Sequence, residues 1–145
     1  MLLLLQRVGQ AAVEVDGRII AEIGPGLLVF AGFGRDDTDG DLPRAAERLV
    51  AYRVFADPAG KMNLDVRQSG GEILIVPQFT LLADTARGLR PSFTPAAEPA
   101  AGERLFTAFV AHVGRLWPAT ACGRFGATMQ VKLINDGPAT FILRG

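Results

Sequence analysis

The sequence has few of the residues that most enzymes use for catalysis or for binding metals. Its single cysteine, Cys122, excludes an intrachain disulfide and fits a reducing compartment. Its single histidine, His112, falls beside the apolar face of an expected helix, where a boundary role is more common than catalysis. No His, Cys, Asp and Glu cluster has metal-ligand spacing, and no glycine-rich phosphate loop occurs. We therefore expect no metal, no cofactor and no histidine-activated nucleophile.

The chain also lacks net charge and long apolar runs. Fifteen basic and fifteen acidic side chains give a formal net charge of +0, which disfavours a protein that wraps a nucleic-acid duplex and leaves room for a small footprint such as a single-stranded end. The apolar start, Met1 to Leu5, has no basic segment before it and is shorter than the roughly seven residues of a signal-peptide core. No run approaches the roughly 18 residues of a membrane span. We therefore expect a cytoplasmic protein without membrane contact.

What the sequence does contain predicts one compact domain over residues 1–145. Hydrophobic residues make up 49% of the chain, and 17 glycines and 9 prolines indicate many turns. The expected class is α+β, with a largely antiparallel, barrel-like sheet and two helices. Expected strands cover 2–8, 11–15, 18–23, 27–33, 73–76, 117–122, 128–134 and 139–143. Expected helices cover 42–50, capped by Asp41, and 102–116, and residues 61–68 are ambiguous.

The stretch from Ile73 to Thr80 carries the first candidate site. Four strand formers lead into Pro77, Gln78, Phe79 and Thr80 and then into the long loop 82–99. If the strand stays regular, Gln78 and Thr80 point to one face and Phe79 to the other, so an amide and a hydroxyl form a polar pocket floor. The alternative is an ordinary strand end whose polar groups are hydrogen-bonded.

A second stretch, Asn135 to Thr140, is the expected companion of the first. Asn-Asp-Gly-Pro is a sound turn between two strands, but Gly137-Pro138 can also act as a rigid probe that rejects ligands by shape. Met129 is either a core residue or a soft bed for an adenine ring. Arg7 is either exposed or buried against an acceptor. Our hypothesis is that the two stretches together form a small active site.

The absence of a base limits what such a site can do. Without a titrating partner, catalysis must come from backbone N–H groups, hydroxyls and groups on the substrate. Backbone donors stabilise an oxyanion without any side chain that titrates. That chemistry suits a substrate that is already activated, such as an ester.

Together these residues resemble the D-aminoacyl-tRNA deacylase family over essentially the whole chain. The order and spacing of the landmarks are more specific than any one of them. They are Leu5-Gln6-Arg7-Val8, Asp16-Gly17, Gly24-Pro25-Gly26, Lys61-Met62-Asn63-Leu64, Gln78-Phe79-Thr80-Leu81, Arg90-Pro91-Ser92-Phe93, Gly123-Arg124-Phe125-Gly126-Ala127, Met129-Gln130-Val131 and Asn135-Asp136-Gly137-Pro138. The resemblance implies a homodimer that hydrolyses the ester between a D-amino acid and the 3′-terminal adenosine of tRNA, without a metal.

The resemblance also implies roles for individual residues. Gly137 and Pro138 form a cis dipeptide that enters the partner's pocket and excludes L-amino acids, and Arg7 helps to fix it across the interface. Gln78, Phe79 and Thr80 form the catalytic pocket that holds the ester. Met129 lies near the adenine, and Asn135 belongs to the substrate-binding set. Thr80 acts either as the nucleophile or beside a 2′-hydroxyl that assists; the missing base favours the second.

Two departures from the family pattern leave alternatives open. Pro77 stands where the family usually has serine, and Ala139 where it has valine. A proline at position 77 is typical of a related animal deacylase that admits L-alanine. A phenylalanine at position 79 is not typical of that deacylase. The alternatives are therefore a deacylase with relaxed chirality that acts on L-alanyl-tRNA, a non-catalytic dimer that binds tRNA 3′ ends, and a purely structural dimer. Removal of glycine from glycyl-tRNA is a further activity that the sequence leaves open.

Overall fold

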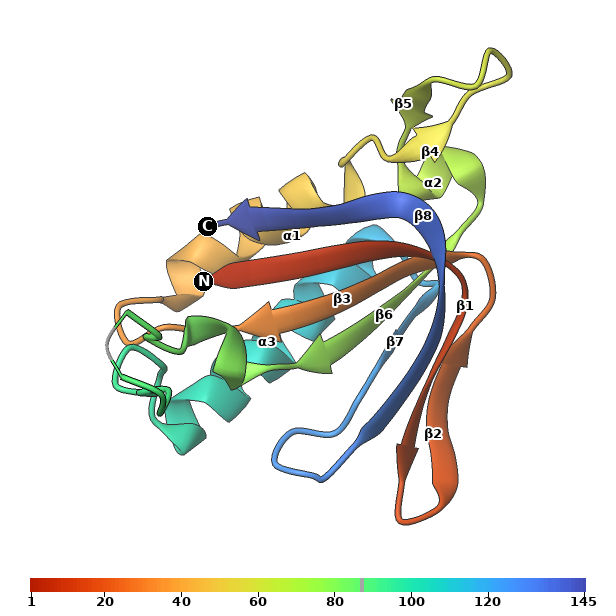
Figure 1. Cartoon of the computed structure of the whole chain (residues 1–145). Coiled ribbons are helices and arrows are strands. Elements are labelled where there is room, and N and C mark those ends of the chain that lie inside the picture. The colour runs from red at the N-terminus through yellow and green to blue at the C-terminus, as the bar shows by residue number, and fades with distance from the viewer. Residues whose placement is uncertain (87) are drawn as a thin grey trace.

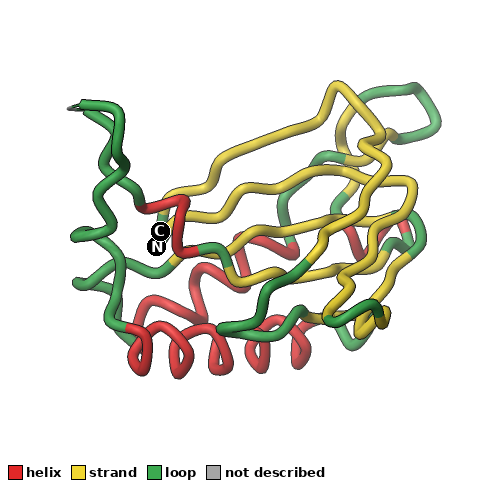
Figure 2. The backbone as a smooth tube through the Cα atoms, turned by 60° about the horizontal axis from the view of Figure 1, so that its bottom comes forward, coloured by secondary structure: helices red, strands yellow, loops and turns green. Residues whose placement is uncertain are grey.

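A computed structural model describes residues 1–86 and 88–145 (Figure 1). A bent sheet curls into a nearly closed barrel, and the two longest helices lie along one side of it (Figure 2). None of the described helices has the length and apolar character that a membrane span needs. The elements are β1 Leu2–Val15, β2 Arg18–Ile23, β3 Gly26–Gly32, η1 Asp39–Asp41, α1 Leu42–Val50, β4 Phe55–Ala56, β5 Met62–Leu64, α2 Val66–Ser69, β6 Glu72–Pro77, η2 Phe79–Leu82, α3 Pro99–Leu116, β7 Thr120–Cys122 and β8 Gln130–Arg144.

The sheet is mixed, which corrects the largely antiparallel expectation. β1 pairs antiparallel with β2, β3 and β8, but β3–β6 and β6–β7 run parallel. Parallel neighbours need a crossover, and α1 and α3 lie within the two connections. β3 and β6 are buried on both faces: Leu27 and Ile73 face the helices, whereas Leu28 and Leu74 face the barrel interior. Such strands are continuously apolar.

The two expected strands at the N-terminus form one continuous strand. β1 pairs with β3 as far as Val8 and with β2 from Ala11 onward, so it passes from one partner to the other without leaving the sheet. The Asp16-Gly17 turn is confirmed, with φ of 50° and 75° at the two residues. The C-terminal strands are likewise one strand, β8, which pairs antiparallel with β1 along almost its whole length.

The helix boundaries match the expectation with two exceptions. α1 spans the predicted residues, but the side chain of Asp41 does not cap it. The carboxylate instead accepts hydrogen bonds from the N–H and hydroxyl of Thr38, at 2.9 and 2.7 Å, and the hydroxyl bond lowers the pKa of Asp41. α3 begins at Pro99 rather than at Gly102, because a proline is readily accommodated in the first helical turn. β7 is shorter than expected and begins at Thr120.

The ambiguous stretch 61–68 resolves into strand β5 and helix α2. Asp65 is buried and caps α2: it accepts hydrogen bonds from the N–H groups of Arg67 and Gln68 at 2.9 and 3.0 Å. The guanidinium of Arg67 also donates to Asp65 at 2.6 Å, and this bond is the main reason that the pKa of Asp65 lies below its ordinary value. The carboxylate therefore stabilises the fold in its ionised form.

We expect Asp65→Ala to lower the free energy of unfolding by about 1–2 kcal/mol at pH 7. Because folding lowers the pKa of Asp65, its contribution is complete above an unfolded pKa of about 3.9 and is lost as pH falls through the folded value. Urea unfolding of both proteins at pH 7 and at pH 3 should therefore show a smaller difference at pH 3. Exposed Asp36→Ala is the control, and a difference for Asp65→Ala that does not vary with pH would contradict this account.

Candidate functional site

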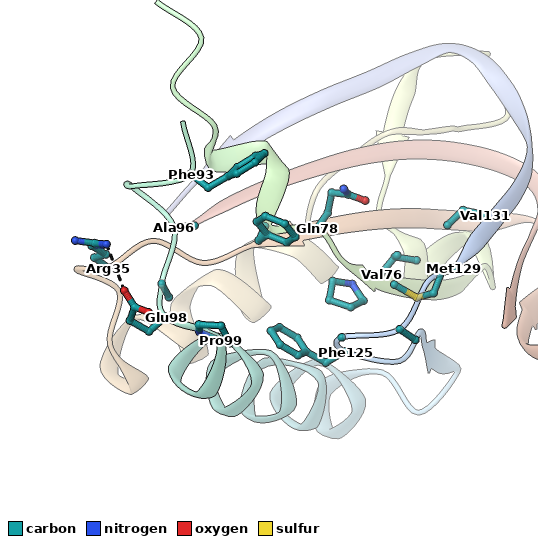
Figure 3. A pocket seen from close by; sticks show the side chains of 15 residues that line it. Arg35, Val76, Gln78, Phe93, Ala96, Glu98, Pro99, Phe125, Met129 and Val131 are labelled. Carbon is teal, nitrogen blue, oxygen red and sulfur yellow. Dashed lines mark hydrogen bonds and ion pairs between the residues drawn. The ribbon is translucent and has the colours of Figure 1, made fainter. Parts of the chain in front are cut away.

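A pocket of about 570 Å³ opens where β6 leaves the sheet (Figure 3). Its walls come from the end of β6, the segment after it, the loop before α3, the turn after β7 and the start of β8. Most of the lining is apolar. The residues that line it are Arg35, Val76, Pro77, Gln78, Phe79, Phe93, Ala96, Ala97, Glu98, Pro99, Phe125, Gly126, Ala127, Met129 and Val131.

Gln78 and Thr80 lie side by side, but not on a strand as expected. β6 ends at Pro77, and residues 79–82 form the 3₁₀ helix η2, so the alternation of faces does not apply. The N–H of Gln78 still donates to the carbonyl of Ala31 at 2.8 Å, which anchors the turn to β3. The Gln78 amide donates to the Thr80 hydroxyl at 2.5 Å. The expected pairing of an amide and a hydroxyl is therefore present, produced by one helical turn.

A close approach of backbone to backbone holds this turn in place. A Cβ at Gly32, the last residue of β3, would lie 2.8 Å from the carbonyl oxygen of Gln78. Only glycine therefore fits at this point of β3 without a shift of the Gln78 segment. Phe79 and Thr80 are both exposed, and Pro77 and Gln78 separate them from the buried segment Ile73 to Val76.

Met129 lies in the same pocket as Gln78 and Phe79, although fifty residues separate them in the chain. It is half-buried, and its sulfur lies 2.9 Å from where a Cβ at Gly123 would be, so the glycine makes room for it. Phe125 comes from the same connection and also lines the pocket (Figure 3). Met129, Val131 and Phe125 make this part of the lining apolar, which suits a planar ring.

The ionisable side chains of the lining are Arg35 and Glu98, which pair with each other at 3.3 Å at the far end from Met129 (Figure 3). His112 lies in α3 and contacts Arg115 at 2.8 Å rather than the pocket. Among the described residues, no group of three His, Cys, Asp or Glu could hold a metal ion. Away from this ion pair, the polar groups of the lining are backbone groups and the Gln78 amide, which is bonded to the Thr80 hydroxyl.

The second candidate stretch forms a bulge in β8 rather than a turn between strands. Val8 pairs with Asn135 and Gln6 with Thr140, so residues 136–139 stand opposite Arg7 alone. Both halves of β8 continue in one direction along β1. The sequence of this segment predicted a turn because bulges and turns favour the same residues.

Arg7 lies under the bulge and is mostly buried, with a 13% exposed side chain. Its guanidinium donates to the Asp136 carbonyl at 3.1 Å, pairs with the Asp136 carboxylate at 2.8 Å and donates to the Val54 carbonyl at 2.6 Å. The Asn135 amide donates to the Arg7 carbonyl at 2.9 Å. The Gly137–Pro138 peptide bond is cis, and both residues are exposed. These contacts hold the bulge firmly within its own chain.

The structure thus brings together only part of the expected site. Gln78, Phe79 and Met129 line the pocket and Thr80 is bonded to Gln78, whereas Arg7, Asn135, Gly137 and Pro138 line no part of it. Within one chain the two stretches do not form a common site. The sequence reasoning missed Arg35 as a site residue and used Phe93 and Phe125 only as family landmarks. An aromatic residue within a Pro- or Gly-rich segment was the available signal.

Comparison with known proteins gives consistent matches over the whole chain. A family model described as D-Tyr-tRNA(Tyr) deacylase matches residues 4–144. The chain is 54% identical to a D-aminoacyl-tRNA deacylase of Stenotrophomonas maltophilia (strain R551-3), with 99% of each covered, and 55% identical to one of Ralstonia nicotianae, with 99% of this chain and 90% of that one covered.

Two experimental structures share the fold. One, the c-Myc DNA Unwinding Element Binding Protein, has a TM-score of 0.95 and 34% identity, with 100% of this chain and 99% of that chain covered. The other, described as a probable eukaryotic D-amino acid tRNA deacylase, has a TM-score of 0.85 with 98% and 97% covered. At 20% identity it supports the fold alone.

Proposed function

Since this chain belongs to the D-Tyr-tRNA(Tyr) deacylase family and is an aminoacyl-tRNA ester hydrolase, we propose that it removes D-amino acids from the 3′-terminal adenosine of tRNA in the cytoplasm. The observation that supports this most is the convergence of Gln78, Phe79 and Met129 in one pocket whose ionisable residues, Arg35 and Glu98, lie at its far end. An ester needs orientation and oxyanion stabilisation more than it needs a strong base. The whole chain, residues 1–145, acts as one deacylase-like domain in this proposal.

The proposed mechanism uses the substrate and the start of η2. Water attacks the ester carbonyl carbon, the bond to the 3′-oxygen breaks, and that oxygen leaves with a proton, which yields the free D-amino acid and tRNA. The first N–H groups of a helix have no partner within it, so those of Phe79 and Thr80 are the candidate donors to the oxyanion. The adenosine 2′-hydroxyl assists the proton transfer, because the lining offers no base beside Thr80. Met129 lies against the adenine.

We further propose that the protein is a homodimer in which Gly137 and Pro138 enter the partner's pocket and exclude L-side chains. The bulge is exposed, is held by Arg7 and lies outside its own pocket. Among the described strands β8 pairs with β1 alone, and it exposes Ile134 and Ile142 at 59% and 55%. Exposed apolar side chains beside a strand edge favour association with another chain. In this arrangement Arg7 and Asn135 hold the filter rigid from behind.

Pro77 supports a second candidate activity, on L-alanyl-tRNA. It lines the pocket at the position where the family usually has serine, so a hydroxyl and an N–H are absent there. A filter that works by shape also has little to reject in alanine and nothing in glycine, which has no side chain. Glycyl-tRNA is therefore included in the proposed substrates.

The test is deacylation of matched D- and L-tyrosyl-tRNA by the purified protein, with glycyl- and L-alanyl-tRNA as additional substrates. We expect hydrolysis of the D-tyrosyl ester at least about a hundredfold faster than of the L-ester. Ala127→Trp, which fills the pocket, should remove the activity, and Ala59→Trp in an exposed turn should not. Hydrolysis of L-alanyl-tRNA alone would favour the second activity; binding of tRNA without hydrolysis of any ester would favour the non-catalytic module.

A further inference from the structure

At the end of the pocket away from Met129 the proposed chemistry uses only the backbone N–H of Phe79, and the side chains there have no part in it. We call it the outer half; it is formed by Arg35, Phe79, Phe93 and Glu98. Figure 3 shows Arg35, Glu98 and Phe93 at this end and Met129 with Val131 at the other. The rings of Phe79 and Phe93 meet edge to face, with centroids 5.1 Å apart and planes at 69°. Both remain well exposed, at 53% and 41%.

The exposed ring of Phe93 is carried on an anchored backbone. Ser92 and Asp84 exchange two backbone hydrogen bonds at 2.9 and 2.8 Å, and the N–H of Ala96 donates to the Phe93 carbonyl at 3.0 Å. The N–H of Arg35 donates to the Pro95 carbonyl at 3.1 Å, which ties the same loop to the end of β3. An exposed aromatic ring held in this way is typical of a stacking platform for a nucleic-acid base.

Arg35 gives the outer half a cation beside the two rings. Its side chain is 53% exposed and its partner Glu98 is 77% exposed, with 3.3 Å between them. Exposed ion pairs of this kind contribute little, so a phosphate can take the place of the carboxylate on the guanidinium. An exposed aromatic ring in the same pocket as an exchangeable arginine matches the chemistry of one nucleotide: a base and its phosphate.

We propose that the outer half of the pocket binds the penultimate nucleotide of the RNA strand, its base against Phe93 and Phe79 and its phosphate against Arg35. This inference rests on the proposed function, in which the terminal adenosine occupies the end near Met129. In this inference the strand continues from that end toward the opposite one, where Figure 3 shows Arg35, Glu98 and Phe93. Because every base has a face that can stack, the subsite accepts any base.

The test compares a substrate that contains this nucleotide with one that lacks it together with the rest of the tRNA. D-tyrosyl-tRNA carries it, and 3′-O-D-tyrosyl-adenosine does not. We expect Phe93→Ala to lower kcat/KM about tenfold on the tRNA and less than about twofold on the adenosine ester, with Phe93→Trp close to wild type. Leu89→Ala is the matched control, since Leu89 lies in the same loop, is fully exposed and lines no part of the pocket. Thermal unfolding of each variant reports on folding.

Arg35→Gln tests the phosphate contact separately. The variant should lower kcat/KM on the tRNA. It should also make the slope of log(kcat/KM) against log[salt] less negative by about 0.7, the value for one phosphate on a single strand. Equal losses on both substrates in Phe93→Ala would place the aminoacyl group in the outer half and overturn the inference, as would no loss on either.

Direct binding separates this inference from the proposed function. Binding of the oligonucleotide CCA and of adenosine monophosphate is measured for wild type and Phe93→Ala by calorimetry. If wild type hydrolyses neither ester, the proposed function fails. The subsite then stands if Phe93→Ala weakens CCA binding alone, and falls if it does not.

Discussion

A D-tyrosyl-tRNA whose terminal adenosine lacks the 2′-hydroxyl should be deacylated at least about a hundredfold more slowly than the normal substrate, whereas Thr80→Ala should keep activity within about tenfold of wild type. The difference follows from the pocket lining. The Thr80 oxygen accepts a hydrogen bond from the Gln78 amide, and the lining places no base beside the hydroxyl to take its proton. A 2′-hydroxyl is bound next to the ester in every turnover, so its assistance is intramolecular.

Single-turnover rates at saturating enzyme separate this chemistry from binding. Thr80→Ser keeps the hydroxyl and serves as the matched control for Thr80→Ala, and equal binding of both tRNA substrates confirms that the deoxy ester still enters the pocket. The reverse pattern, with a reactive deoxy substrate and an inactive Thr80→Ala that binds normally, would make Thr80 the nucleophile.

The absence of a base beside Thr80 also limits the kind of substrate that the site can process. Arg35 and Glu98 pair with each other at the outer end, away from the Gln78 amide. The lining therefore supplies shape, apolar walls and hydrogen-bond donors. Such a site accelerates a reaction whose substrate already carries a good leaving group, as an ester does, and has little to offer an amide.

Three of the residues singled out in the sequence, Gln78, Phe79 and Met129, line one pocket, but the local geometry differs from the expectation. Gln78 and Thr80 were expected to be adjacent because of strand alternation, but Pro77 ends the strand and a helical turn makes the contact. Phe93 could not be assigned from local pattern. Its position depends on hydrogen bonds between Ser92 and Asp84, which join residues that no periodicity relates.

The errors in the fold have similar causes. Continuous apolar runs in β3 and β6 indicate strands buried on both faces, and such strands are typical of parallel pairing, yet the short hairpin signals near the N-terminus suggested an antiparallel sheet. Residues 135–138 are Asn, Asp, Gly and Pro, all of which favour turns. Only the register of β8 against β1 shows that the chain bulges and continues. Local signals therefore predicted where the chain departs from a regular strand. Long-range pairing determined whether it forms a turn or a bulge at that point.

Pro138→Ala should raise hydrolysis of L-tyrosyl-tRNA about tenfold to a hundredfold while D-tyrosyl-tRNA is hydrolysed at close to the wild-type rate. The proposed filter acts by occupying space that an L-side chain needs, so a smaller residue relaxes the exclusion. Exposed Pro58→Ala is the control for loss of a proline elsewhere. Parallel loss of D- and L-hydrolysis would instead indicate that Pro138 positions the substrate.

Heterodimers decide whether the filter acts in its own chain or in its partner. One chain of the mixed dimer is Pro138→Ala, with an open pocket and an altered bulge, and carries one affinity tag. The other chain is Ala127→Trp, with a filled pocket and an intact bulge, and carries a second tag. Tandem purification isolates the mixed dimer. If the filter acts across the dimer, the open pocket receives the intact bulge, and the mixed dimer hydrolyses D-tyrosyl-tRNA and rejects the L-ester. If it acts within one chain, the open pocket keeps its own altered bulge and hydrolyses both. Because the lining of the pocket includes neither Gly137 nor Pro138 of its own chain, we expect the first result.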